Sequence, residues 1–463
     1  MIDRFLPFLE EVGEQIRGFI RNGSSFLVLS ANTPDGLSAS LLLIKFFYEN
    51  DIESHFKFID MIDESFFQYL FGSPEKSYDH DVYIFLDIGS RFIGKIYDNS
   101  RNKNKKIIVI DHHDLVSKNI KLENFYQVNP NIFGINGKRE ASTSSIVYTI
   151  LKLYGHVFKG EEILGLSGPI SEKQDQKELT GLNKYVLEDL MNKDVIQIKR
   201  TIKLSGFLNK PLYKVLSSSL DVYIPGVSGS DEKSIEFLRK LFPDKEIEKL
   251  YFNDLKPDEE KKLVNEIIKN RVLNNIMQNE RIVGDVYLIS KSPYGFKDVG
   301  ELSFIITSAT YLGKHNFLVR YLIRNTGFEN LLDIETYFRG RVSSIISDIV
   351  RNKANISEKD GIIFIKVPNK ERESYTSYVA DVLSYNDILD KRYYISYSEY
   401  KDYYEVSLRR SKKEGEIPGM VFSLIEKYNG ILSGKDNLCG FYIRKSLFDE
   451  FKDKLSDILL KFS

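Results

Sequence analysis

Three acidic positions in the first quarter of the chain carry residues that can bind divalent metal ions. Asp35 lies in an Asp-Gly step, Asp87 ends an apolar run, and Asp111 is followed directly by His112 and His113. Carboxylate oxygens are the ligands that Mg²⁺ and Mn²⁺ prefer, and imidazole also suits Mn²⁺. Two such ions ~3.5–4 Å apart activate water and neutralise charge when a phosphodiester is hydrolysed. These residue types predict phosphoester chemistry if the fold brings them together.

Each of these positions follows a short apolar run that is typical of a buried strand. The strand runs are 24–30, 82–86 and 107–110, and the helical segments near them are 4–21, 37–48 and 142–154. Continuous apolar strands that alternate with helices predict a parallel sheet buried on both faces. Because ligands bind beyond the carboxyl ends of such strands, we expect the acidic and His side chains at one sheet edge.

Each residue also has a simpler explanation. Asp35 could cap the helix that starts beside it, and Asp87 and Asp111 could be ordinary acids at strand ends. The joint spacing of the three favours a shared site. The other four His residues have no evident partners and are expected to be structural or exposed, and Cys439 is expected to be packed.

The Asp111-His112-His113 step after an apolar strand resembles the signature of the DHH phosphoesterases. Together with Asp35-Gly36, Asp87 and the block from Val128 to Ser142, it resembles the RecJ-type exonucleases. The C-terminal region resembles the associated DHHA1 domain. The segments Ile224–Gly229 and Gly300–Gly313 are similar to the archaeal RecJ-like nuclease that binds GINS.

The resemblance implies a set of metal ligands, and two of the family's ligand positions are changed. Metal ligands would be Asp35, Asp87, His112 and Glu172, either functional or vestigial, and Asp111 and His113 would be catalytic in an active enzyme. The family's first motif, His-x-Asp-x-Asp-Gly, has Ala31 and Thr33 at its first two ligand positions here. Mn²⁺ or Mg²⁺ is therefore the expected cofactor if there is one, and a two-metal mechanism is expected to be broken.

The same resemblance places nucleic-acid contacts in the C-terminal region. Ser407, Arg409 and Arg410 match the family's phosphate-binding segment, and Gly434 and Lys435 match a glycine-rich motif in which Lys435 replaces a His. Arginine offers a planar fork of donors that suits phosphate oxygens, whereas lysine offers a point charge.

Two functional hypotheses follow from the resemblance. The first is an archaeal replication factor that is non-catalytic or weakly catalytic, and that binds GINS and MCM in the replicative helicase as well as single-stranded DNA. The alternative is a Mn²⁺-dependent single-strand exonuclease in repair or primer removal. A small-molecule phosphodiesterase is disfavoured, because such enzymes need the intact first motif.

Composition and length set the expected domain organisation. The chain has 463 residues, 65 Lys and Arg, 66 Asp and Glu, and one Cys, which excludes a disulfide scaffold and a Cys-based zinc site. We expect an α/β fold in four parts: a parallel-sheet DHH domain (1–194), a mainly helical insertion (195–280), a helical connection (281–350) and a smaller α/β domain (351–463), with a cleft between the lobes.

The C-terminal part divides into alternating elements. Strands are expected at 362–365, 393–396 and 404–409, helices at 375–383, 418–428 and 447–460, and a loop at 433–440. The near-neutral charge argues against bulk electrostatic binding to nucleic acid. No apolar run is long enough for a transmembrane helix and no signal core is evident, so we expect a cytoplasmic protein without a membrane partner.

Overall fold

The structure is a computed structural model that describes most of the chain. It leaves out residues 73–79, 102, 104, 116–120, 123, 280–281, 353–354, 370–372, 412–416, 429, 436–437 and 462–463, and the side chains of 64, 121, 352 and 431–438. The chain forms two compact units. The first comprises 1–200, 285–310 and 314–334, and the second comprises 201–284, 311–313 and 335–463.

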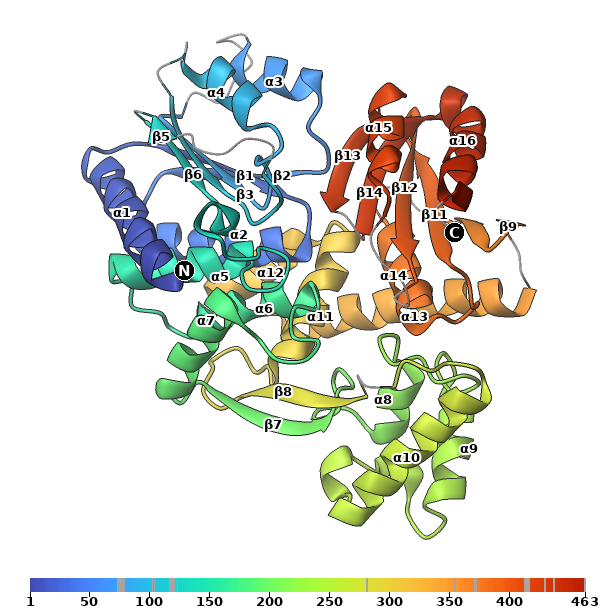
Figure 1. Cartoon of the computed structure of the whole chain (residues 1–463). Coiled ribbons are helices and arrows are strands. Elements are labelled where there is room, and N and C mark those ends of the chain that lie inside the picture. The colour runs from blue at the N-terminus through green and yellow to red at the C-terminus, as the bar shows by residue number, and fades with distance from the viewer. Residues whose placement is uncertain are drawn as a thin grey trace. The chain divides into compact units, whose positions relative to one another are not determined.

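The first unit contains the parallel sheet that the sequence predicts (Figure 1). Its strand order is β2-β1-β3-β4-β6-β5, and all pairs are parallel except β5 with β6. The strands are β1 (Phe26–Ala31), β2 (Ser54–Ile59), β3 (Val82–Leu86), β4 (Lys106–Ile110), β5 (Lys121–Leu122) and β6 (Phe125–Val128). The predicted strand at 82–86 is confirmed to the residue, and those at 24–30 and 107–110 to within two residues.

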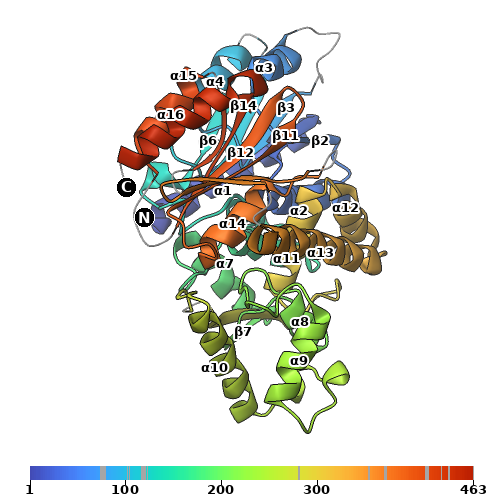
Figure 2. The ribbon, with the colours of Figure 1, turned by 90° about the vertical axis from the view of Figure 1, so that its right-hand side faces the viewer.

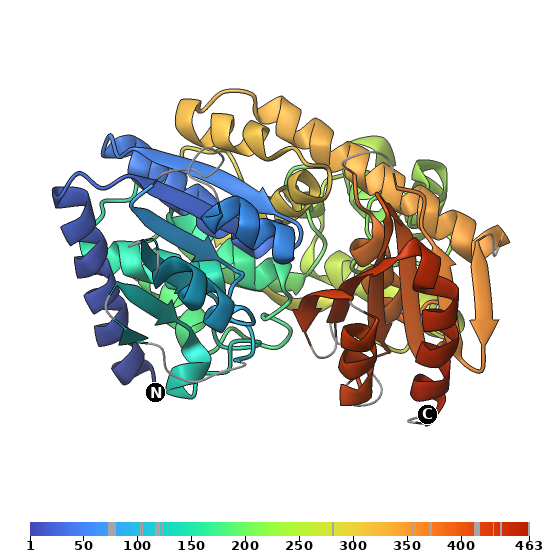
Figure 3. The ribbon, with the colours of Figure 1, turned by 90° about the horizontal axis from the view of Figure 1, so that it is seen from above.

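Helices bury both faces of this sheet, which explains why the central strands are apolar throughout. On one face, side chains such as Leu29 and Phe85 pack against α3 (Glu64–Phe71) and α4 (Ile93–Arg101). On the other face, the ring of Phe26 lies 4.9 Å from that of Phe47 in α2. Figure 3 shows the strands in blue and teal, with the dark-blue helix α1 beside them.

The remaining helices of the first unit lie before, among and after the sheet strands in the sequence. They are α1 (Ile2–Arg21), α2 (Pro34–Glu49), α5 (Thr143–Tyr154), α6 (Leu164–Ser171), α7 (Gly181–Asn192), α11 (Val299–Tyr311) and α12 (His315–Arg324). Helix α11 contacts α6 through a hydrogen bond from Ser303 Oγ to the carbonyl of Ser167 (3.1 Å). None of the helices in the described residues combines the length and apolar character needed to cross a membrane.

His315, at the start of α12, connects this helix to the loop after β1. Its ring stacks on Phe58 with centroids 4.2 Å apart, and its Nε2 lies 2.8 Å from Asn32 Oδ1. The amide oxygen can only accept a hydrogen bond, so the imidazole donates from Nε2. Burial lowers the pKa of His315 to about 4, although the nearby Asp60 acts in the opposite direction.

This buried imidazole predicts a loss of stability in mild acid. A His in the unfolded chain has a pKa of about 6.5, so between about pH 6.5 and 4 the unfolded state binds the proton first. Stability should therefore fall as the pH falls through this window, by up to ~1.4 kcal/mol per pH unit. Melting temperatures of wild type and His315→Asn, measured at neutral pH and in mild acid, test this. Equal pH dependence in the two proteins would contradict the prediction.

The second unit contains a helical segment and the C-terminal sheet. Between β7 (Ile196–Ile202) and β8 (Val283–Ile289), which pair with each other, lie α8 (Leu212–Ser217), α9 (Asp231–Leu241) and α10 (Pro257–Leu273). The sequence predicts a mainly helical insertion at 195–280; the structure places α8, α9 and α10 there, together with the β7 and β8 ribbon, which was not predicted.

Short 3₁₀ helices occur in both units. They lie at Pro130–Phe133 and Glu161–Ile163 in the first unit, and at Ile247–Lys249, Phe252–Asp254 and Lys445–Leu447 in the second.

The C-terminal sheet has the strand order β13-β14-β12-β11-β10-β9, in which only β10 and β11 are parallel neighbours. The elements are α13 (Phe328–Asn352), β9 (Ile356–Lys359), β10 (Ile362–Lys366), α14 (Thr376–Asn386), β11 (Tyr393–Tyr400), β12 (Tyr403–Arg410), α15 (Gly419–Lys427), β13 (Ile431–Lys435), β14 (Leu438–Arg444) and α16 (Phe448–Lys461). An apolar core joins one sheet face to α15 and α16, and α14 contacts β11 and β12 (Figure 2).

The expected strands and helices of this region are confirmed within a few residues, with one exception. The segment 433–440 was expected to be a loop because it contains Gly434 and Gly440, but its described residues, 433–435 and 438–440, belong to the antiparallel pair β13 and β14. Backbone pairing with the neighbouring strand overrides the weak strand preference of glycine.

Candidate metal centre

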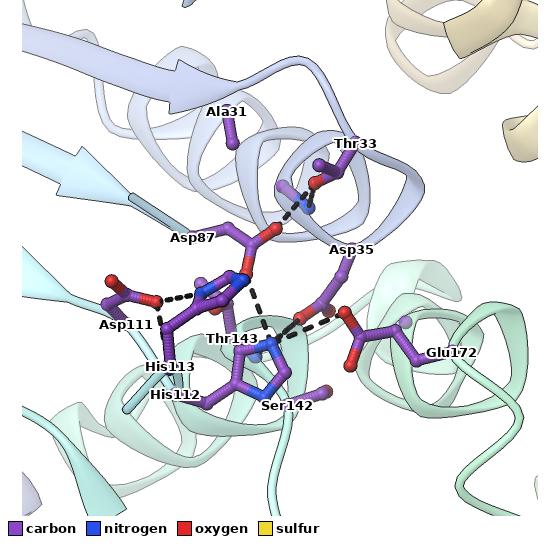
Figure 4. A network of polar contacts seen from close by, with 12 residues as sticks. Ala31, Thr33, Asp35, Asp87, Asp111, His112, His113, Ser142, Thr143 and Glu172 are labelled. Atoms are coloured by element: carbon purple, nitrogen blue, oxygen red, sulfur yellow. Dashed lines mark hydrogen bonds and ion pairs between the residues drawn. The ribbon is translucent and has the colours of Figure 1, made fainter. Parts of the chain in front are cut away.

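The carboxyl ends of β3 and β4 position the first group of polar side chains. Asp87 directly follows β3 and has a positive φ of 58°, a left-handed conformation that Asp tolerates better than most residues. Its N–H donates to the carbonyl of Ile110 (2.9 Å), which fixes it beside the end of β4. Asp111, His112 and His113 follow β4, so the predicted convergence at one sheet edge is confirmed (Figure 4).

Asp35 reaches this site from the first turn of α2. Its two carboxylate oxygens accept hydrogen bonds from the N–H groups of Thr143 (2.6 Å) and Ser144 (2.9 Å), the first residues of α5. A negative charge at this position also stabilises the positive end of the α5 dipole. The helix of Asp35 itself is capped by Thr33, whose Oγ1 accepts from the N–H of Gly36 (2.9 Å). The simpler explanation of Asp35, that it caps its own helix, is therefore wrong.

His112 is completely buried and oriented for metal binding. Its Nδ1 lies 2.6 Å from the carbonyl oxygen of Gly137, which can only accept, so the ring proton sits on Nδ1. Nε2 then faces oxygens of Asp87 (3.2 Å), Glu172 (3.4 Å) and Asp35 (3.5 Å). A carbonyl partner on the outer ring nitrogen is the usual support for a metal-bound His.

These four residues form a compact donor set for one divalent ion. One ligand atom from each of Asp35, Asp87, His112 and Glu172 lies within 4.8 Å of the others. Burial raises the pKa of Asp35 to about 6, and the charges of Asp87 and Glu172 add to the effect. Three carboxylates clustered around one imidazole repel one another, and burial adds a desolvation cost to their negative charges. A divalent cation would offset this charge, so the arrangement fits a metal site.

Asp111 orients the half-buried neighbour of this site, His113. One oxygen of Asp111 accepts from the N–H of Ser90 (2.9 Å), and the other accepts from the N–H of His113 (3.1 Å) and from its ring Nδ1. Burial alone would raise the pKa of Asp111, but the charge and hydrogen bond of His113 outweigh it and hold the pKa well below its usual range. His113 is thus held with its other ring nitrogen available.

A second ion beside the first would have an incomplete ligand set. Asp87, His112 and His113 also place one donor atom each within 4.8 Å of one another, but the first two ligand positions of the family's first motif add no strong ligand to them. Ala31, at the end of β1, has no donor atom, and Thr33 offers only a hydroxyl. That hydroxyl donates to Oδ2 of Asp87 (2.5 Å), while the hydroxyl of Thr143 donates to Oδ1 (3.0 Å). Both carboxylate oxygens of Asp87 are therefore hydrogen-bonded to protein hydroxyls (Figure 4).

Two segments of the chain match models of known protein domains. The N-terminal domain of the DHH family matches residues 27–173, and the DHH-CID domain matches residues 204–283. The chain therefore contains a DHH-family N-terminal domain and a DHH-CID domain. In sequence, the chain is 27% identical over 293 residues to the uncharacterized protein MJ0831 of Methanocaldococcus jannaschii. The match spans 62% of this chain and 64%, just under two thirds, of that relative.

Solved structures share the fold of this chain over almost its whole length. CDC45 from Entamoeba histolytica matches with a TM-score of 0.65 and 11% identity, covering 96% of this chain and 98% of that chain. An exonuclease RecJ bound to manganese matches with a TM-score of 0.54 and 14% identity, covering 98% and 95%. RecJ with Mn²⁺ from Thermus thermophilus also has a TM-score of 0.54 at 14% identity, covering 98% and 55%. The fold is RecJ-like and CDC45-like.

The sequence did not point to Gln174, which supports two of the candidate ligands. Its Nε2 lies 3.0 Å from Oε2 of Glu172 and 3.3 Å from the carbonyl of Gly137, the partner of His112. Its own Oε1 accepts from Asn183 (2.6 Å) at the start of α7. The only signal in the sequence was its place two residues after Glu172.

Replacing Gln174 should therefore weaken metal binding by this protein. We expect Gln174→Ala to lower Mn²⁺ affinity about 10–100-fold, because outer partners that orient metal ligands typically contribute that much. Titration calorimetry or the electron paramagnetic resonance of free Mn²⁺ measures this directly. Gln197→Ala, at an exposed position of β7, is the matched control and should bind as wild type does. Unchanged affinity in the Gln174 variant would contradict the supporting role.

The C-terminal residues predicted to contact nucleic acid lie in a different unit. Ser407 is buried with its Oγ 3.2 Å from that of Ser377, and the Nε of Arg409 donates to Asp381 (2.5 Å). The guanidinium of Arg410 lies 5.4 Å from the ring centre of Tyr393. Gly434 and Lys435 lie on β13, but their side-chain positions are outside the described residues. The nucleic-acid role of these residues stays a prediction.

A further group of potential metal ligands lies elsewhere in the first unit. Glu49, His156 and Glu161 each place one donor atom within 4.8 Å of the others. However, the ammonium groups of Lys45 (3.2 Å) and Lys159 (3.1 Å) already pair with Glu49. Glu161 in turn accepts from His156 (3.0 Å). These ion pairs account for the cluster without a metal.

Proposed function

We propose that this protein is an archaeal replication factor of the RecJ-like family, non-catalytic or weakly catalytic. In this proposal it binds GINS and MCM in the replicative helicase, as well as single-stranded DNA. The partners follow from the resemblance of Ile224–Gly229 and Gly300–Gly313 to the archaeal RecJ-like nuclease that binds GINS. The CDC45-like fold over 96% of the chain is in keeping with this role.

One observation carries the non-catalytic part of the proposal. Thr33 donates to Asp87 at the place where a second ion would need a carboxylate, and Ala31 supplies no ligand. Two-metal phosphodiester cleavage relies on one ion for the attacking oxygen and another for the leaving oxygen. A second site that keeps only Asp87, His112 and His113 as ligands should retain little of this activity.

The complete donor set of the remaining site gives it a defined role in the proposal. Mn²⁺ or Mg²⁺ is the expected ion at Asp35, Asp87, His112 and Glu172, where it would supply Lewis-acid polarisation of a phosphate oxygen. Asp111 holds the ring of His113 so that its free nitrogen can donate to or accept from a phosphate. Asp35, through its bonds to the start of α5, couples ion binding to the packing of that helix.

The alternative function is a Mn²⁺-dependent single-strand exonuclease in repair or primer removal. It is favoured by the four clustered ligands, three of which are buried, and by the proton on Nδ1 of His112. A site that no longer binds metal would need neither feature. Such an enzyme would work with one ion, or with a second ion held partly by the nucleic acid.

A nuclease assay separates the two functions. Purified wild type, Asp87→Ala and the exposed control Asp98→Ala are incubated with end-labelled single-stranded DNA or RNA in Mn²⁺, Mg²⁺ or EDTA. The proposal expects at most trace shortening by wild type. Metal-dependent shortening by wild type and Asp98→Ala that disappears in Asp87→Ala would overturn it in favour of the exonuclease.

Binding assays test the partners separately from cleavage. Gel shifts with the same labelled strands measure the affinity of the protein for single-stranded nucleic acid. This affinity should fall as the salt concentration is raised. Pull-downs with purified GINS and MCM measure the protein contacts, which Asp87→Ala should leave unchanged. Absence of both protein contacts would contradict the replication role, whatever the outcome of the nuclease assay.

A further inference from the structure

A groove on the first unit, separate from the metal-centre residues, runs along helix α12. It has a volume of about 630 Å³ and is lined by residues of α12 and by Tyr48 near the end of α2. Its apolar lining comes from Tyr48, Phe317, Val319 and Ile323, and its charged lining comes from Arg320 and Arg324. A volume of this size is within the range of pockets that hold ligands, ~300–1,000 Å³.

Helix α12 buries one face in the first unit and also presents apolar side chains among the charged ones on its groove side, which a purely structural helix does not require. Leu318, Tyr321 and Leu322 are buried in the first unit. On the groove side, Phe317 remains 37% exposed and Tyr48 remains 59% exposed. Large aromatic side chains gathered in a concave surface are typical anchoring points for a binding partner.

The charge of the groove specifies the chemistry of that partner. Arg320 and Arg324 are four residues apart, so they lie on the same side of α12 and repel each other. Neither guanidinium forms a salt bridge with any residue that the structure describes, and no acidic side chain lines the groove. A ligand with carboxylates beside Arg320 and Arg324 would relieve the repulsion between them. Apolar side chains of the same ligand would contact the apolar lining of the groove.

We propose that this groove binds a segment of a partner protein that carries apolar anchors flanked by acidic residues, as on a short amphipathic helix. Val319 and Ile323 place branched aliphatic side chains beside the rings of Tyr48 and Phe317, and this mixed apolar lining suits leucine or phenylalanine side chains of a peptide. A nucleic acid whose bases stack on the two rings is the competing occupant, which the DNA titration below tests. The inference rests on the groove alone and is independent of the replication role.

Fluorescence anisotropy with defined peptides tests the groove. The probe is a short fluorescein-labelled peptide with Leu and Phe on one helical face and Asp and Glu beside them. Matched peptides carry Lys in place of every acid, or Ser in place of Leu and Phe. The full-length chain is compared with the Arg320→Glu/Arg324→Glu variant and with Lys184→Glu, an exposed control on α7. Labelled single-stranded DNA is titrated in parallel.

The acidic apolar peptide should bind wild type and Lys184→Glu alike, and at least about tenfold more weakly to the double Arg variant, because attraction becomes repulsion at both positions. Both altered peptides should lose affinity for wild type by a similar factor. Absence of peptide binding to wild type would overturn the proposal. Equal binding to the double Arg variant, or DNA binding that alone depends on these two arginines, would also overturn it. Both arginines are exposed, so circular dichroism of the variant should match wild type.

Discussion

Restoring the two missing ligands, in Ala31→His/Thr33→Asp, is expected to raise Mn²⁺-dependent cleavage of single-stranded DNA at least about a hundredfold over wild type. The new carboxylate at position 33 would stand where the Thr33 hydroxyl now lies 2.5 Å from Asp87. Two facing carboxylates and a new imidazole create a second site beside the first. Initial rates on end-labelled DNA, with and without EDTA, measure the gain.

The same change has a signature in stability that does not depend on cleavage. Without metal, the carboxylate introduced at position 33 would replace a hydrogen bond to Asp87 by repulsion between like charges, so the melting temperature should fall. Saturating Mn²⁺ should then raise the melting temperature more in the variant than in wild type, because the ion binds only the folded site. Thr33→Asn is the matched neutral control. A variant that gains neither cleavage nor Mn²⁺ stabilisation would show that more than these two ligands is missing.

The largest loss of stability is expected from Arg271→Ala in the second unit. Arg271, on α10, is only 2% exposed, and its guanidinium donates to Asn386 of α14 (3.0 Å), Asn279 (3.0 Å) and the carbonyls of Tyr223 and Gln278. Truncation removes these bonds and leaves buried oxygens without their donor, at ~1–3 kcal/mol for each unsatisfied group. We expect a loss of at least ~3 kcal/mol, measured by urea unfolding.

An exposed arginine of the same helical segment supplies the control. Arg239, on α9, is 62% exposed and pairs with Glu248, so Arg239→Ala should change stability by no more than ~1 kcal/mol. Arg271→Lys should lie between wild type and Arg271→Ala, because one ammonium group cannot reach all four acceptors. Equal midpoints for the Arg271 and Arg239 variants would contradict the role of Arg271 in joining α10 to α14.

The parallel sheet and the convergence of its acidic residues were predictable from local patterns. Strands such as β3 are continuous apolar runs, and Asp87 and Asp111 follow their strands directly. Since parallel strands end at the same edge, position in sequence translates into position in space. The expected helices and strands of the C-terminal region followed from the same kind of local signal.

The C-terminal residues show where local patterns are insufficient. Arg409 matches a phosphate-binding segment in sequence, yet its guanidinium pairs with Asp381 on α14, 28 residues earlier. The pairing depends on the contact between α14 and β12, which no local pattern encodes. The hairpin of β13 and β14 was missed for the same reason, because cross-strand pairing outweighed the glycines.

The sequence by itself determined which chemical groups are available to the metal centre: three carboxylates and an imidazole that suit one ion, and no ligand at position 31. Only the tertiary structure decided how these groups are held. Asp35 binds the start of α5 through residues 108 and 109 positions later, and Gln174 reaches both Glu172 and the carbonyl behind His112. Such bonds join helices that are distant in sequence, and they form only when packing brings buried polar groups together and leaves them no water to bind instead.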